Sequence, residues 1–91
     1  MELIATISTE DSKKMERIFE RKTGLENILN ISAPNPLVIE EQLYEKFIND
    51  YNSVVREMQE YWAELAEKYS FKSEEGKEWM IEFESQNIFL S

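Results

Sequence analysis

A long helix with a wide apolar face is the feature that most constrains the fold of this chain. Between residues 36 and 69, apolar side chains recur every seven residues in three adjacent rows. The rows contain Leu37, Tyr44, Tyr51, Met58 and Leu65; Phe47, Val54 and Tyr61; and Ile48, Val55, Trp62 and Tyr69. Three rows form a face wider than the two-row seam of a coiled coil. A helix of this length reaches about 50 Å, so we expect other segments, or a second copy of the chain, to cover it.

The residues before this helix predict a strand, a helix and a break. Residues 3–7 alternate as a half-buried strand does. The stretch Ser8–Ser12 offers a hydroxyl cap and two acids for the first turn of a helix over residues 10–30. Pro34 and Pro36 then separate the two helices, because proline cannot continue the first helix and suits the first turn of the second.

The residues after the long helix predict a β-hairpin over residues 78–90. Trp79, Ile81 and Phe83 alternate with Met80, Glu82 and Glu84, and the stretch Ser85–Asn87 is typical of a turn. Because two strands alone are marginally stable in water, we expect the N-terminal strand to add a third. The apolar side of the hairpin, with Trp79, is expected to lie on the 36–69 helix.

We therefore predict a single α+β domain over residues 1–91, in the order β-α-α-β-β. In this fold a long antiparallel helical hairpin carries a small antiparallel sheet, which the N-terminal strand and the C-terminal β-hairpin form. Gly24 lies inside the predicted 10–30 helix, where glycine costs roughly 1 kcal/mol relative to alanine. Close packing or a local kink would explain its presence.

The composition excludes many kinds of site, because the chain contains no cysteine and no histidine. Disulfides, Cys/His zinc sites, thiol nucleophiles and histidine relays are therefore absent. The net charge of −9 disfavours direct binding to nucleic-acid phosphates or to an anionic membrane surface. The chain has no apolar run long enough for a membrane span and no basic segment of a signal peptide, so we expect a cytoplasmic protein.

Carboxylates are the remaining candidates for chemistry. Three pairs have helical spacing: Glu57 with Glu60, Glu64 with Glu67, and Glu75 with Glu78. Acids of this kind hold Mg²⁺ when they project into a pocket. The first two pairs lie opposite the apolar rows, and the third pair lies in the connector before the hairpin. We therefore predict a solvated acidic face, with no metal site, no cofactor and no catalytic residue.

Aromatic side chains are concentrated in the second half of the chain, where ten of the eleven lie at or after Tyr44. Most are expected in the core. Tyr61, Trp62, Tyr69 and Trp79 are expected to converge where the long helix meets the hairpin. Amphipathic aromatic side chains also grip peptides, so these four are the candidate partner-binding residues.

Five of the ten basic residues lie in the 10–30 helix, which carries Lys13, Lys14, Arg17, Arg21 and Lys22. Antiparallel packing would place this basic surface beside the acids of the 36–69 helix. Surface ion pairs of this kind contribute about 0–1 kcal/mol each. The alternative is a docking surface for an acidic partner on the first helix, or for a basic partner on the second.

Several stretches resemble a small bacterial family, the CXXX-repeat peptide modification system proteins, which occur beside radical-SAM maturases and Cys-rich precursor peptides. The resemblance is carried by Phe19–Leu25, the stretch from Leu43 through Trp62, Glu75–Glu84 and Ile88–Leu90. It implies an accessory protein of a peptide-maturation system and supplies no active site. Family members tend to carry a cysteine in the terminal hairpin, where this chain has Ser85–Asn87, which puts any role of that cysteine in doubt here.

Two functions follow from these observations. The first is a non-enzymatic adaptor that binds a peptide or protein through the aromatic residues of the long helix or through an exposed edge strand. The second is an acidic inhibitor, of the phage anti-defence type, that imitates nucleic acid by presenting carboxylates in place of phosphates. The wide apolar face would also allow a homodimer through the long helix.

Overall fold

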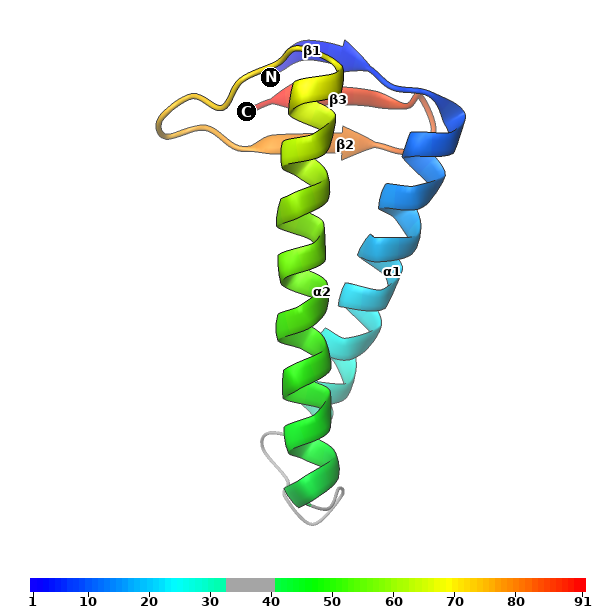
Figure 1. Cartoon of the computed structure of the whole chain (residues 1–91), viewed down its shortest axis with the longest axis vertical. Helices are drawn as coiled ribbons and strands as arrows, with labels where there is room; N and C mark the ends of the chain where they lie inside the picture. The colour runs from blue at the N-terminus through cyan, green and yellow to red at the C-terminus, as the bar shows by residue number, and fades with distance from the viewer. Residues whose placement is uncertain (33–40) are drawn as a thin grey trace. The chain divides into compact units, whose positions relative to one another are not determined.

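The computed structural model describes residues 1–32 and 41–91 and confirms the α+β fold in the predicted order. The elements are β1 (Glu2–Thr6), α1 (Thr9–Ser32), α2 (Glu41–Lys68), β2 (Trp79–Glu82) and β3 (Asn87–Leu90) (Figure 1). The strand and the first helix each lie within two residues of their predicted bounds. The proline break, and residues 36–40 of the predicted long helix, lie outside the described residues.

The sheet has the order β1-β3-β2, so the last strand of the chain lies between the other two (Figure 1). Both pairings are antiparallel, and β1 supplies the third strand as predicted. The β1–β3 register shifts between Leu3 and Ala5, which marks a bulge at Ile4. The hairpin turn spans residues 83–86. The predicted turn therefore began too late: Phe83 has left the strand, and Asn87 pairs with Glu82.

The described chain divides into two compact units. The sheet unit comprises Met1–Glu16 and Glu60–Ser91, and thus the sheet with the first turns of α1 and the last turns of α2. Its buried apolar side chains come from every one of these segments: Ile7, Met15, Tyr61, Leu65, Phe71, Ile88 and Leu90. Along β3, Ile88 and Leu90 are buried while Phe89 between them is half-buried, so one face of the sheet is the core face.

The helical unit, Arg17–Gln59, contains the remaining parts of α1 and α2. Ile18 and Val54 are its buried side chains among the described residues. Arg21 donates from Nη1 to Glu57 Oε2 at 3.0 Å, which is one ion pair of the kind predicted between the basic and acidic helices. A Cβ added to Gly24 would meet nothing within 4 Å. Close packing therefore does not explain this glycine, because the space beside it is open.

The end of α2 is fixed by a Schellman motif without glycine. The Phe71 amide donates to the Ala66 carbonyl at 3.0 Å, and Ser70 adopts a left-handed φ of 57°. Phe71 lies at the position where such motifs usually place an apolar residue, and it is buried. The helix therefore ends at Lys68, one residue before the predicted end. Neither described helix is long and apolar enough to cross a membrane.

Candidate functional site

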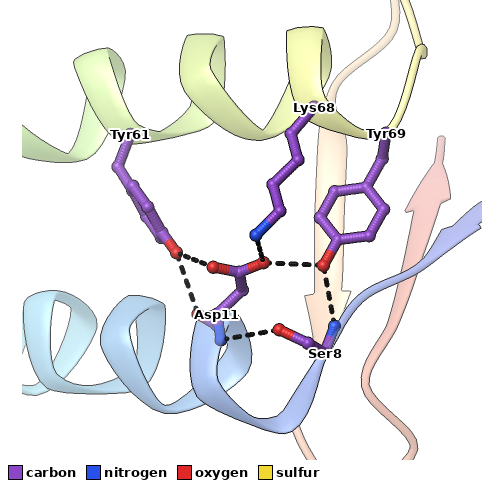
Figure 2. A network of polar contacts seen from close by, with 5 residues as sticks. All are labelled: Ser8, Asp11, Tyr61, Lys68 and Tyr69. Atoms are coloured by element: carbon purple, nitrogen blue, oxygen red, sulfur yellow. Dashed lines mark hydrogen bonds and ion pairs between the residues drawn. The ribbon is translucent and has the colours of Figure 1, made fainter.

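The densest polar cluster in the sheet unit is centred on Asp11, in the first turn of α1 (Figure 2). Oδ2 of Asp11 accepts hydrogen bonds from Tyr69 Oη at 2.6 Å and from Lys68 Nζ at 2.7 Å. Oδ1 accepts a third from Tyr61 Oη at 3.0 Å. We call Asp11, Tyr61, Lys68, Tyr69 and Ser8 the Asp11 network. It joins the start of α1 to the end of α2 within the sheet unit.

The same network caps α1. Ser8 Oγ accepts a hydrogen bond from the Asp11 amide at 3.1 Å, as an N-cap residue does. In a standard capping box, the acid three residues later would accept from the Ser8 amide. Here the Ser8 amide donates to Tyr69 Oη at 2.9 Å, and that hydroxyl donates to Asp11 (Figure 2). A phenol from the end of α2 therefore completes the cap of α1.

Three members of the network, Asp11, Tyr61 and Lys68, are held more strongly in their ordinary charge states. Partial burial opposes ionisation of Asp11, but hydrogen bonds from Lys68, Tyr69 and Tyr61 outweigh it and hold the pKa of Asp11 well below its usual value. Burial, together with the hydrogen bond to Asp11 and its charge, raises the pKa of Tyr61. The hydrogen bond to Asp11 raises the pKa of Lys68. All three groups therefore titrate farther from neutral pH.

These shifts oppose acid–base catalysis. A general acid or base works best with a pKa near the working pH, and an attacking tyrosine would need a lowered pKa. Asp11, Tyr61 and Lys68 are shifted the other way. Both carboxylate oxygens of Asp11 already accept hydrogen bonds from side chains. The hydrogen bonds of the Asp11 network thus suit a structural role, in which they hold the start of α1 to the end of α2.

A second cluster consists of three aromatic rings, two of which pack against Trp79 of β2. The Trp62 ring of α2 lies 5.6 Å from the Trp79 ring of β2, between centroids. Phe71 meets Trp79 edge to face at 5.1 Å. Both geometries are favourable for aromatic pairs. Trp79 is the register partner of Leu90, which is buried, so these rings lie on the core face of the sheet.

The four aromatic residues predicted from the sequence all belong to the sheet unit, but they form two groups. The rings of Trp62 and Trp79 lie against each other at a tilt of 33°, as expected where the long helix meets the hairpin. Tyr61 and Tyr69 instead bind Asp11 of α1. Tyr61 is only 5% exposed, and Lys14 Nζ lies 4.5 Å from its ring centroid. Partner binding by these four residues stays a prediction, and Tyr61 offers a partner little surface.

The three acid pairs do not come together around a cavity. Glu60, Glu64, Glu67, Glu75 and Glu78 are exposed, and Glu57 is half-buried beside Arg21. Over residues 1–32 and 41–91, no group of three or more acids has the geometry of a metal site. The carboxylates of the acidic face are thus arranged as a solvated surface.

The outer face of the sheet carries an exposed apolar row that crosses all three strands. In the strand register, Leu3 of β1 and Met80 of β2 both pair with Phe89 of β3. Leu3 is 54% exposed and Met80 is 48% exposed. We call Leu3, Phe89 and Met80 the outer row. Sequence reasoning missed it, because the alternation of each strand marks two faces but only the strand order shows which residues align.

No family model, curated protein or solved structure matches this chain.

Proposed function

We propose that this protein is a non-enzymatic adaptor that binds a peptide or protein partner through the outer face of its sheet. The observation that carries the proposal is the outer row: two large apolar side chains, Leu3 and Met80, stay about half exposed on either side of Phe89. Apolar side chains aligned across strands and left in water are typical of interaction surfaces.

The chemistry of the side chains supports a binding role over an enzymatic one. The chain has no cysteine or histidine nucleophile or base. Its most strongly perturbed groups, Asp11 and Tyr61, are shifted away from neutral pH and hydrogen-bonded to each other. The resemblance to CXXX-repeat peptide modification system proteins supports a partner from a peptide-maturation system.

A nucleic-acid mimic is the second candidate. Glu60, Glu64 and Glu67 of α2 are exposed and form no ion pair within the described chain, so they are available to imitate phosphates. A mimic would bind a basic partner through many carboxylates, and its affinity would fall steeply with salt. Docking on the outer row also buries apolar area, which salt does not screen, so its affinity should fall less steeply with salt than that of a mimic.

Affinity capture from the native host, followed by mass spectrometry, tests the proposed function. We expect Leu3→Ser combined with Met80→Ser to lose the partner that the unmodified protein captures. The matched control is Ile28→Ser combined with Leu43→Ser, which removes exposed apolar side chains from the helical unit. Retention of the partner by the outer-row variant, or loss of it only with Glu60→Lys and Glu67→Lys, would contradict docking on the sheet.

A further inference from the structure

The sheet has one outer strand with an unbroken register, β2. Glu78 and Ser91 exchange two backbone hydrogen bonds, of 2.8 and 2.9 Å. In an antiparallel ladder, hydrogen-bonded and non-hydrogen-bonded pairs alternate. Met80 and Glu82 therefore bond to β3, whereas the N–H and C=O groups of Trp79 and Ile81 point away from it. Because β2 is an outer strand, these groups face the free edge.

The opposite edge of the sheet is less suited to pairing. β1 carries the bulge at Ile4, and bulges twist an edge away from further strands. Glu2, Leu3 and Ile4 also line a hollow of about 380 Å³ together with residues of the 70–74 stretch. β2 has an unbroken register of four pairs with β3. The β2 edge is thus the better template.

The side chains of the β2 edge have a defined charge pattern. Glu78, Met80 and Glu82 lie on the outer face, opposite to Trp79 and Ile81. All three are exposed, and neither glutamate forms an ion pair within residues 1–32 and 41–91. For a strand added antiparallel to β2, these three residues occupy non-hydrogen-bonded positions, where cross-strand side chains approach most closely. The edge therefore presents acid, apolar and acid at a spacing of two residues.

We propose that β2 binds an extended basic segment as a fourth strand, with the pattern basic-x-apolar-x-basic, where basic is Lys or Arg. The two basic side chains pair with Glu78 and Glu82, and the apolar side chain lies on Met80. The residues marked x form the backbone ladder with Trp79 and Ile81. This inference rests on the proposed adaptor function and specifies the chemistry of its partner.

A second copy of the chain fits this edge poorly. Two β2 strands paired antiparallel about Met80 would place Glu78 of each copy opposite Glu82 of the other. Like charges directly opposite each other destabilise strand pairing, and the net charge of −9 adds long-range repulsion. The same acids attract a basic strand, so the charge pattern selects against self-association and in favour of the basic partner.

Binding of a labelled peptide tests the proposal. The probe is a fluorescein-labelled, end-blocked peptide with the core Lys-Thr-Val-Thr-Lys, and fluorescence anisotropy measures its affinity. Methylating the amide nitrogens of both threonines keeps the charges but blocks the ladder, and we expect it to weaken binding by at least about tenfold. A peptide with the core Glu-Thr-Val-Thr-Glu should not bind. Equal binding of the methylated peptide, or no binding of the parent peptide, would overturn the proposal.

Variants and amide exchange locate the site. Glu78→Lys with Glu82→Lys should weaken peptide binding by at least about tenfold, because two attractive pairs become repulsive. Glu60→Lys with Glu67→Lys changes the net charge equally on α2 and should weaken it less than about threefold. The peptide should slow amide exchange at Trp79 and Ile81, whose N–H groups face the free edge, more than at Met80. Unchanged exchange at both residues would contradict strand addition.

The captured partner separates this inference from the adaptor function. A host partner that is lost with Leu3→Ser and Met80→Ser but retained by Glu78→Lys with Glu82→Lys would leave the adaptor function standing and refute the basic strand. If the peptides and variants behave as expected but affinity capture from the host yields no partner, the result would support the β2 site and count against the adaptor function.

Discussion

The sheet unit and the helical unit differ in how deeply they bury the apolar side chains of their helices. Of the nine buried apolar side chains among the described residues, seven belong to the sheet unit and two, Ile18 and Val54, to the helical unit. The three apolar rows of α2 nevertheless run through both units. In the helical unit most of their members are half-buried: Tyr44, Phe47, Ile48, Tyr51, Val55 and Met58.

This difference shows which structural information a heptad pattern carries and which it lacks. The spacing shows which side of a helix is apolar, but the depth of burial depends on what covers that side. In the sheet unit the covering layer is a three-stranded sheet together with the Phe71 ring. We therefore expect the stability of the protein to reside mainly in the sheet unit, and the following measurements test that expectation.

The largest effect is expected from Leu65→Ala. Leu65 is fully buried in the sheet unit, and truncating such a leucine costs about 2–5 kcal/mol. Leu43→Ala is the matched change in the helical unit, where Leu43 is 43% exposed, and it should cost less than about 1 kcal/mol. Urea denaturation followed by circular dichroism measures both. Equal losses would contradict the comparison of the two units.

Asp11→Asn should have the next largest effect. The substitution keeps the shape of the side chain but removes the charge that accepts hydrogen bonds from Tyr61, Lys68 and Tyr69. We expect a loss of about 1–3 kcal/mol in unfolding free energy. In the helical unit, Glu26 accepts hydrogen bonds from Lys22 and Tyr51 but is more exposed, so Glu26→Gln should cost less than about 1 kcal/mol. The reverse order of losses would contradict a structural role for the Asp11 network.

Low pH should decrease the stability of the sheet unit, because it protonates the Asp11 carboxylate. The pKa of Asp11 is lower in the folded protein than in the unfolded chain, so the unfolded chain binds this proton more readily. Its stabilisation is fully present above the unfolded value of about 4 and is lost as pH falls through the folded pKa. Melting temperatures measured between pH 6 and pH 2 should therefore converge for the unmodified protein and Asp11→Asn. Parallel curves would contradict this assignment.

The smallest effect is expected in the helical unit, from Gly24→Ala. The position is helical, and an added Cβ would meet nothing within 4 Å. Alanine should therefore raise the free energy of unfolding by about 0.5–1 kcal/mol, because glycine loses more backbone freedom in a helix. Thermal denaturation measures the change. A loss of stability would contradict the open space beside Gly24.

The sequence was sufficient to predict the elements and their order, because hydrophobic spacing is a local property. It also marked Ser8–Ser12 as a helix cap with acids suited to the first turn. It did not predict that Tyr69 would complete this cap, because that contact joins residues 61 positions apart and depends on how α2 ends. The end itself depends on Ser70 in a left-handed conformation, which composition does not indicate. The outer row was missed because it exists only once the strands are ordered.

The central place of β3 has a consequence for synthesis on the ribosome. Glu2 pairs with Leu90, and β2 has no other partner strand in the sheet. Translation proceeds at about 5–20 residues per second, so the first strand waits roughly 4 to 18 seconds for its neighbour to be made. During that interval β1 has no partner strand, whereas β2 is made only a few residues before β3. A chaperone or an early-binding partner would have its greatest influence on this protein in that interval.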